Sequence, residues 1–265
     1  MDKRGRSIYA FIDAANLFYG GERSMHFRID YEKLIAYLRA KFAVTKVFYY
    51  AGVDVETYKE EGKKLNLGKL VKFYENEMLS VKGEVSAGIK RTEEEKVLLE
   101  AHLNRAMFYR DLEKFGYDLR IKPTKVFVST EGITTTKANC DVDLTFDMMR
   151  YMSQYNEAIV MSGDGDFAPI VEYLKAKKKK ITILARAERT AREIKELAGV
   201  NFVDFKSIRK EIESKSEKVS IVSRKIGRDS TRRIISSKKI RRNNVAVMNN
   251  GVTIKRKIPK FRKGF

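Results

Sequence analysis

Carboxylate side chains follow two apolar segments that have the composition of buried strands. Asp13 ends the run Ile8–Ile12, with Asn16 three residues later, and Asp164 and Asp166 follow the run Ala158–Met161. Ligands of open α/β sheets bind beyond the carboxyl ends of the strands, so we expect these side chains to lie close together. Carboxylate and amide oxygens are ligands for hard divalent cations. The pattern therefore predicts a metal site at one edge of a sheet.

Asp141 is a third source of carboxylate, at the start of a helix predicted for Val142–Met152. The three- and four-residue spacing of this helix predicts a buried apolar stripe, formed by Val142, Phe146, Met149 and Met152. Charged residues lie on another face, which we interpret as solvated: Asp143, Asp147 and Arg150.

Each acid also has a purely structural interpretation. Asp141 suits a helix N-cap, Asp13 suits a loop entry or cap, and Asp164 with Asp166 suits a turn that leads into a helix. Several carboxylates gathered at one sheet edge would repel one another unless a cation neutralised them. The metal hypothesis therefore rests on the cluster of Asp13, Asp141, Asp164 and Asp166 rather than on any one member.

Phosphodiester hydrolysis is the chemistry that suits such a cluster. A cation held by carboxylates lowers the pKa of a bound water and neutralises charge in the transition state, so the protein needs no nucleophile of its own. His26 and His102 are the only histidines and Cys140 is the only cysteine, which disfavours zinc clusters and paired-histidine nucleases. No glycine-rich phosphate loop follows a predicted strand.

Basic and aromatic residues near the acids could hold a nucleic-acid substrate. Lys137 precedes Asp141, and three arginines follow a later predicted strand: Arg186, Arg189 and Arg192. We predict that these four side chains bind substrate phosphates and that the neighbourhood of Tyr19 offers an aromatic face to a base. Ordinary surface charge is an equally good interpretation of each basic residue.

Short β-rich runs alternate with helical patterns over residues 1–206. Further strands are predicted at Lys46–Ala51, Leu119–Ile121 with Lys125–Ser129, Ile181–Ala185 and Phe202–Val203. Helices are predicted at Tyr31–Phe42, Glu93–Tyr117 and Phe167–Lys177, and Lys82–Thr92 is predicted to be a loop. Alternation of this kind predicts an α/β fold whose mostly parallel central sheet is flanked by helices.

Positive charge is concentrated at the C-terminal end. The net charge is +20, and residues 206–265 hold 20 Lys or Arg but only 4 Asp or Glu. We interpret residues 207–265 as a basic, partly disordered extension, in which Asn249-Asn250-Gly251 could turn a small hairpin over residues 245–254. One cysteine and the lack of an N-terminal apolar stretch favour an intracellular, cytoplasmic protein that does not use a membrane.

Three motifs in order closely resemble the NYN family, in the LabA-like branch of the PIN-like nucleases. They are Phe11-Ile12-Asp13-Ala14-Ala15-Asn16-Leu17, the spacing from Asp141 to Asp147-Met148, and Ser162-Gly163-Asp164-Gly165-Asp166-Phe167. The resemblance covers about residues 7–207. Two departures are Ala138-Asn139-Cys140 after Lys137, where the family has Gly-Val, and Gly165, where the family has Ser between the paired acids.

The resemblance implies a Rossmann-like PIN/NYN domain at residues 1–206 and an endoribonuclease that depends on Mg²⁺ or Mn²⁺. The metal ligands that it implies match Asp13, Asp141, Asp164 and Asp166, with Asn16 assisting. A charged segment around residues 76–106 is longer than the family pattern and is predicted to be a helical insertion of open function.

Two functions therefore stand from the sequence. The first is a metal-dependent endoribonuclease in which a metal-activated water, held by the aspartate cluster, hydrolyses RNA. The second is a non-catalytic RNA-binding or regulatory module of the same fold with a structural cation. DNA is not excluded as a partner, because only the resemblance favours RNA, and a homodimer is left open.

Overall fold

A six-stranded parallel sheet forms the centre of the protein. The computed structural model describes residues 7–53, 66–86, 93–128 and 134–214. The strand order is β3-β2-β1-β6-β7-β8, and every neighbouring pair is parallel. The strands are β1 (Ile8–Asp13), β2 (Lys46–Val53), β3 (Asp118–Pro123), β6 (Glu157–Met161), β7 (Lys180–Ala185) and β8 (Phe202–Asp204). The predicted parallel α/β architecture is confirmed.

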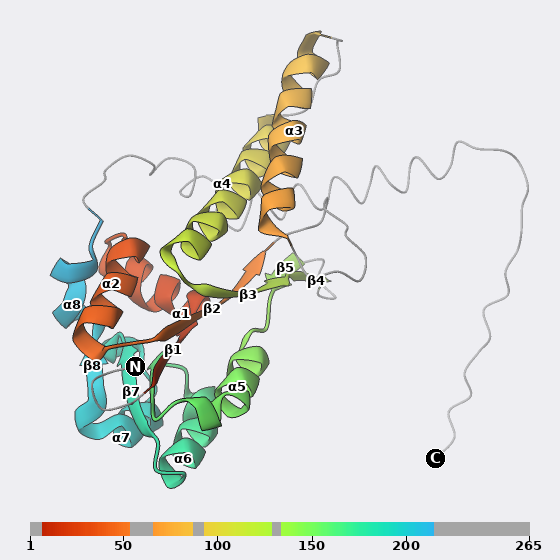
Figure 1. Ribbon diagram of the computed structural model, residues 1–265. Helices are drawn as coiled ribbons and strands as arrows, with labels where there is room; N and C mark the ends of the chain where they lie inside the picture. Colours follow the sequence, from red (N-terminus) through yellow and green to blue (C-terminus); the bar gives the residue numbers. More distant parts are fainter. Residues whose placement is uncertain (1–6, 54–65, 87–92, 129–133, 215–265) are drawn as a thin grey trace, which may run out of the picture.

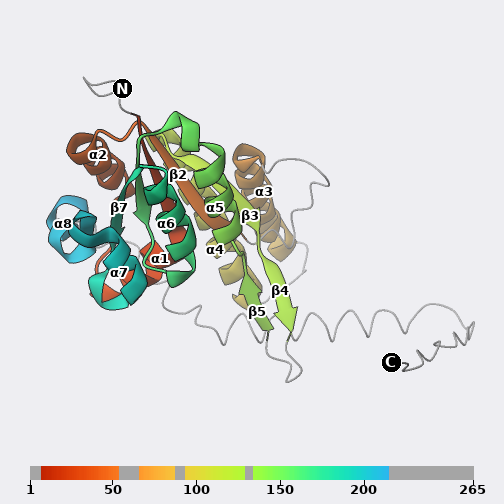
Figure 2. The same ribbon diagram turned by 90° about the horizontal axis from the view of Figure 1, so that it is seen from below.

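Helices cover both faces of this sheet (Figures 1 and 2). One face packs against α2 (Tyr31–Phe42), α3 (Leu67–Ser86), α4 (Glu93–Phe115) and α8 (Phe205–Ile212). The other face packs against α5 (Asp141–Arg150), α6 (Ala168–Ala176) and α7 (Arg192–Ala198). Every residue of β1 and β6 is therefore buried, which explains why these strands read as continuous apolar runs rather than as alternating ones.

The strand order reverses between β1 and β6. From β1 the chain moves to β2 on one side of the sheet, whereas from β6 it moves to β7 on the other side. Ile12 lies opposite Met161 in the register, so the two strands end side by side. A short helix, α1 (Ala14–Asn16), and a π-helical segment, Leu17–Arg23, follow β1 directly. Such a reversal point is where open α/β sheets bind ligands.

The helices α3 and α4 form a pair that extends away from the sheet (Figure 1). They hold the described part of the segment around residues 76–106. The predicted loop at Lys82–Thr92 is wrong for its first residues, because α3 continues through Gly83 to Ser86. One internal glycine costs a helix only about 1 kcal/mol relative to alanine, so Gly83 does not by itself end α3.

A second, two-stranded antiparallel sheet lies outside the main sheet. It consists of β4 (Lys125–Val128) and β5 (Thr134–Lys137). The sequence predicted a strand from Lys125 but not its separation from the main sheet, and it did not predict β5. The run of threonines in β5 suits a strand, because β-branched side chains fit a pleated surface.

The orientation predicted for α5 is wrong. Val142 and Phe146, predicted to be buried, are 67% and 60% exposed, and Met149 is exposed too. Leu144, Met148 and Asp147 face the sheet instead. Both stripes have helical spacing, so hydrophobicity alone did not distinguish them. Burial of a charged Asp147 was not predicted, and it depends on partners from two strands that are described below.

The helix α8 spans the boundary predicted at residues 206–207. Phe205, Ile208 and Ile212 are buried in the core, and the chain then pairs with Arg28 and Ile29 through Ser214 and Glu213. The described body therefore runs to Ser214. Most of the predicted basic extension, including the hairpin at residues 245–254, lies outside the described residues.

Two further features bear on the predicted environment. The Cys140 thiol is free and buried. In the described ranges, every helix is too short or too polar to cross a lipid bilayer.

Candidate functional site

Asp13 connects the end of β1 to the helix that follows. Its Oδ1 accepts hydrogen bonds from the backbone N–H groups of Ala15 at 2.9 Å and Asn16 at 3.2 Å, which makes it the N-cap of α1. The structural interpretation as a cap is therefore correct for this residue. Its second oxygen, Oδ2, accepts from the Ser162 hydroxyl at 3.2 Å. One buried carboxylate thus joins β1, α1 and the end of β6.

Asn16 strengthens the same junction. Its side-chain oxygen accepts a hydrogen bond from the backbone N–H of Gly163 at 3.1 Å, while the Ser162 hydroxyl accepts one from the N–H of Asp164 at 3.3 Å. Gly163 is required there, because a Cβ would lie 2.6 Å from the Thr190 hydroxyl. These bonds hold the predicted site residues of β1 and β6 against each other.

Asp164 and Asp166 follow β6 on a short 3₁₀ segment, Gly165–Phe167. Asp164 caps this segment by accepting from the N–H of Asp166 at 3.1 Å, and Asp166 is exposed. A Cβ at Gly165 would lie 2.3 Å from the Glu193 carboxylate of α7. The space that the family's serine would need here is therefore occupied by the end of a flexible acidic side chain.

Asp141 completes an electrostatically coupled group of four acids. Burial raises the pKa of the Asp141 carboxyl, the negative charges of Asp164 and Asp166 raise it further, and Lys122 opposes them. Burial also raises the pKa of Asp13, hydrogen bonds from Asn16 and Ala15 oppose this, and the charge of Asp141 adds to it. Electrostatic interactions thus link Asp13 with Asp141, and Asp141 with Asp164 and Asp166.

The chemistry of these donors suits a hard divalent cation. All of them are oxygens, none of the four carboxylates forms an ion pair with another described residue, and a cation would relieve the repulsion that raises the two pKa values. In the residues described, however, no three His, Cys, Asp or Glu side chains are arranged closely enough to hold a metal. Carboxylate oxygens are the right kind of ligand for the predicted cation. To coordinate one ion, these side chains would have to move closer together.

The four predicted phosphate-binding residues differ in their surroundings. Arg186 is only 11% exposed and interacts with Glu188 and Asp204. Arg192 is exposed and pairs with Glu196 at 2.6 Å. Arg189 is exposed and lines a surface hollow. Lys137 ends β5, and its side chain lies outside the described part of the structure.

Sequence reasoning missed a polar network that fixes α5 to the sheet. The buried Asp147 carboxylate accepts hydrogen bonds from the Tyr50 hydroxyl at 3.0 Å and from Nε of Arg120 at 2.8 Å. Arg120 also pairs with Asp118 and lies 5.0 Å from the centre of the Phe48 ring. Asp147 was predicted to be solvated, and no local signal in α5 reveals these partners from β2 and β3.

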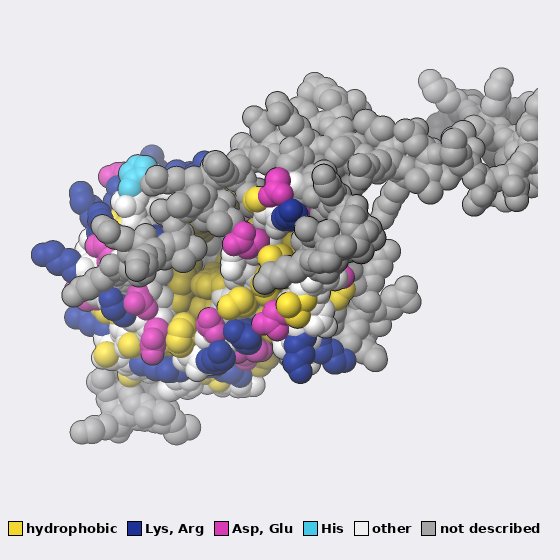
Figure 3. Space-filling view, turned by 90° about the horizontal axis from the view of Figure 1, so that it is seen from above, with side chains coloured by type: hydrophobic (Ala, Val, Ile, Leu, Met, Phe, Trp, Pro, Cys, Tyr) yellow, Lys and Arg dark blue, Asp and Glu magenta, His cyan; other side chains and the backbone are white. Residues whose placement is uncertain are grey.

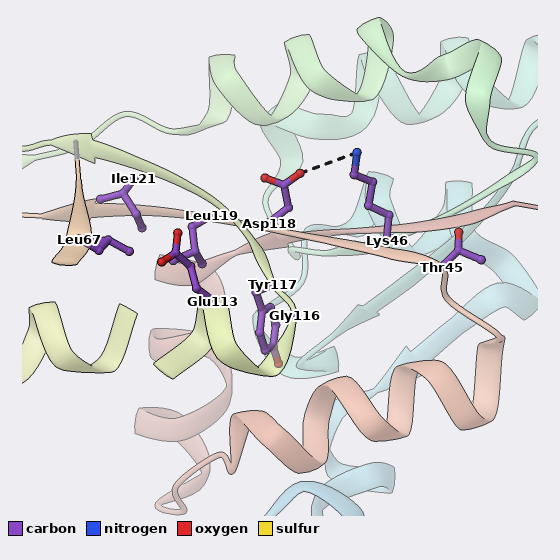
Figure 4. A pocket seen from close by; sticks show the side chains of 9 residues that line it. All are labelled: Thr45, Lys46, Leu67, Glu113, Gly116, Tyr117, Asp118, Leu119 and Ile121. Carbon is purple, nitrogen blue, oxygen red and sulfur yellow. Dashed lines mark ion pairs between the residues drawn. The ribbon is translucent and has the colours of Figure 1, made fainter. Parts of the chain in front are cut away.

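A hollow of about 400 Å³ lies along the outer strand β3, away from the acids (Figure 4). Lys46 and Asp118, 3.8 Å apart, form an ion pair on its wall, and Tyr117 and Leu119 contribute apolar surface. Lys46 and Asp118 begin β2 and β3, whereas the acidic group lies where β1 and β6 end. The hollow therefore belongs to the opposite end of the sheet, where ligands of open α/β sheets do not usually bind.

The described body does not show one dominant sign of charge on the face seen in Figure 3. Lysine and arginine side chains alternate there with aspartate and glutamate. This agrees with the sequence, in which most of the net charge of +20 falls in residues 206–265.

Comparison with known proteins assigns the family. The model of the NYN domain matches residues 7–208. The chain therefore belongs to the NYN domain family, as its motifs predicted.

One relative and two solved structures add detail. The low amplitude and bright protein LabA of Synechococcus elongatus is 35% identical over 118 residues, which are 43% of this chain and 63% of LabA. This chain thus matches less than two thirds of that relative. A crystal structure of a protein of unknown function from Vibrio parahaemolyticus has a TM-score of 0.50 at 17% identity and covers 81% of this chain and 99% of that one. It shows a shared fold alone.

A zinc-bound structure of the T5 5′-exonuclease is more distant. Its TM-score is 0.35 at 17% identity, and the similarity covers 87% of this chain and 74% of that one. A score this low carries no inference about function.

Proposed function

We propose that this protein is an endoribonuclease that depends on Mg²⁺ or Mn²⁺. The observation that carries the proposal is the coupled group of four aspartates at the reversal point of a parallel sheet. Membership of the NYN domain family supports it, since the motifs of this chain resemble those of the LabA-like, PIN-like nucleases. Carboxylates that repel one another cost stability unless a cation neutralises them, and groups with perturbed pKa values cluster at functional sites.

The cation is held by oxygens of Asp13, Asp141, Asp164 and Asp166. When bound, it supplies Lewis-acid polarisation of the scissile phosphate and a more acidic water. Ser162 and the N–H groups of Ala15 and Asn16 orient the Asp13 carboxylate, because they occupy both of its oxygens from the protein side. Asn16 accepts a hydrogen bond from the Gly163 N–H. This bond fixes the backbone of the loop after β6 just before Asp164.

RNA is attracted by positive charge and positioned near the acids. The basic residues 206–265 raise affinity by releasing counterions from the phosphate backbone. Of the four predicted phosphate ligands, Arg189 is the exposed residue that forms no ion pair with another described residue. RNA rather than DNA follows from the family resemblance.

Digestion of RNA by matched variants tests the proposal. The wild-type chain should cut RNA in Mg²⁺ or Mn²⁺, leave 5′-phosphate ends and stop in chelator. Asp141→Asn and Asp164→Asn should each lower the rate by about 100-fold or more. Asp111→Asn is the matched control, because it changes a carboxylate of α4 that pairs with Lys114 at 2.9 Å and is not among the charges acting on Asp13 or Asp141. Cutting that survives Asp164→Asn would refute the assignment.

Binding of the cation can be measured without turnover. A ligand that binds only the folded state at 100 times its dissociation constant adds about 2.7 kcal/mol to the unfolding free energy. Mn²⁺ should therefore raise the melting temperature of the wild-type chain and of Asp111→Asn, but not that of Asp141→Asn.

A second candidate is an RNA-binding module that does not cut. The observation that favours it is that no ready-made group of three metal-ligating side chains exists among the described residues. In that case RNA binding persists in chelator, no products form in Mg²⁺ or Mn²⁺, and the aspartate variants bind as well as the wild-type chain.

A further inference from the structure

A hollow of about 400 Å³ opens on the surface beside the acidic group. Tyr19, Arg23 and Ser24 line it from the π-helical segment after β1 and its end, and Arg189 lines it from the turn after β7. It combines one aromatic ring with two guanidinium groups. Neither arginine forms an ion pair with another described residue, so their charges are available to a ligand.

The aromatic rings at this hollow are unusually accessible. Tyr19 is 48% exposed and Phe18 is 44% exposed, and their ring centres lie 5.2 Å apart in an edge-to-face arrangement. In an edge-to-face pair, one ring covers only one face of the other, so a further ring face remains for a base. The Arg23 guanidinium lies 5.8 Å from the centre of the Tyr19 ring. Since π-helical segments are found mostly at functional sites, this exposure is consistent with a ligand contact.

Gly20, next to Tyr19 in the π-helical segment, packs close to Asn16 and to Arg186. A Cβ at Gly20 would lie 3.3 Å from the Asn16 side-chain oxygen and 3.9 Å from Cβ of Arg186. The π-helical segment therefore packs directly between the Asp13 junction and the turn that carries Arg189. Since β1, β6 and β7 are neighbouring parallel strands, the segments that follow them, which carry Tyr19, Asp164 and Arg189, lie at the same edge of the sheet.

We propose that this hollow binds one unpaired nucleotide of a single-stranded nucleic acid. The base stacks on Tyr19, and Arg23 and Arg189 bind the phosphate next to it. A base inside a duplex presents no face to an aromatic side chain, whereas every unpaired base does. The inference rests on the proposed function, because it names the substrate class of that same site as single-stranded.

The absence of tryptophan from the sequence offers a direct test. Tyr19→Trp introduces a single fluorophore whose emission a stacked base quenches. Tyr173→Trp is the matched control, because Tyr173 is 40% exposed on α6 and has its own cation, Lys177, at 5.4 Å. Both full-length variants are titrated in chelator with a short oligouridine, with the same strand in a duplex, and with an oligomer that carries sugar and phosphate but no bases.

Single-stranded oligouridine should quench Tyr19→Trp saturably and leave Tyr173→Trp unchanged, while the duplex and the baseless oligomer quench neither. Tyr19→Ala should weaken binding of the single strand about tenfold, which is within the range for loss of one stacked base. Arg23→Gln should lower the salt slope of binding by about 0.7, the value for one single-strand phosphate. Equal quenching of both tryptophans, or quenching by the baseless oligomer, would overturn the proposal.

Failure of this proposal is separable from failure of the proposed function. The titration is done without metal, so it is indifferent to whether the chain cuts RNA. If Tyr19→Trp reports no stacking but Asp164→Asn abolishes cutting, the nuclease stands and the hollow has another role. If stacking is seen but no metal supports cutting, the hollow stands and the nuclease does not.

Discussion

Removing the Tyr50 hydroxyl should loosen the helix that carries Asp141 without touching the acidic group. Tyr50→Phe deletes the 3.0 Å hydrogen bond to the buried Asp147 carboxylate. Asp147 lies six residues after Asp141 in α5, and its network attaches this helix to β2 and β3. We therefore expect a loss of stability together with a loss of activity.

The size of the effect follows from the partners that remain. A hydrogen bond to a charged group contributes about 1.5–3 kcal/mol, and a buried carboxylate left short of partners adds a desolvation cost. Asp147 keeps the 2.8 Å bond from Arg120, so the lower end of that range, about 1.5 kcal/mol, is appropriate. For a body of about 200 residues, this corresponds to a fall in melting temperature of about 3–6 °C.

Tyr9→Phe is the matched control. The Tyr9 hydroxyl donates to the neutral Gln154 side chain at 3.3 Å, and its loss should cost about 0.5 kcal/mol, or about 1–2 °C. Thermal unfolding by circular dichroism, with urea denaturation as a second measure, compares the two variants. If Tyr50→Phe lowers the melting temperature no more than Tyr9→Phe does, the Asp147 network does not stabilise α5 and the reasoning is wrong.

Three other predictions concern tight or buried positions. Gly52→Ala should destabilise the protein by about 1–3 kcal/mol in urea denaturation, because the new Cβ would lie 2.4 Å from Cβ of Ala138, which cannot move away as a long side chain can. Gly165→Ser should change the melting temperature by no more than about 2 °C, because Glu193 is exposed and flexible, and a larger fall would contradict this. Burial raises the pKa of Glu22 above 4.5, so its ionisation opposes folding: Glu22→Gln should raise the melting temperature at pH 7, and this gain should vanish as the pH falls towards 4.

The main sheet could be predicted from the sequence because its strands are buried on both faces. The run Ile8–Ile12 is continuously apolar and is shorter than a typical helix, so its pattern favours a buried strand. The helix predicted at Tyr31–Phe42 has the observed bounds, since Asp30 caps its start and Ala43 adopts a left-handed conformation at its end. Where local signals and burial agree, sequence patterns are sufficient.

Prediction failed where the result depends on partners distant in the sequence. The small sheet forms because β4 pairs with β5. The sequence pattern of either strand alone does not reveal this pairing. The continuation of α3 through Gly83 was also missed, because glycine weakens a helix by only about 1 kcal/mol and is therefore a weak stop signal. The burial of Arg186 likewise involves a distant partner, Asp204, which is the last residue of β8.

The same distinction separates the two aspartates of α5 and bears on the candidate site. From the sequence, Asp141 was predicted to be a metal ligand at the start of a helix, and Asp147 was predicted to be a solvated acid on that helix. In the structure, Arg120 and Tyr50 satisfy Asp147, whereas Asp141 faces the charges of Asp164 and Asp166. A carboxylate with its own cation and hydroxyl has little left to offer a ligand, but one held among other carboxylates gains most when a cation binds. This difference supports the proposal of Asp141, rather than Asp147, as a metal ligand, while the bonds of Asp147 to Tyr50 and Arg120 attach the same helix to the sheet.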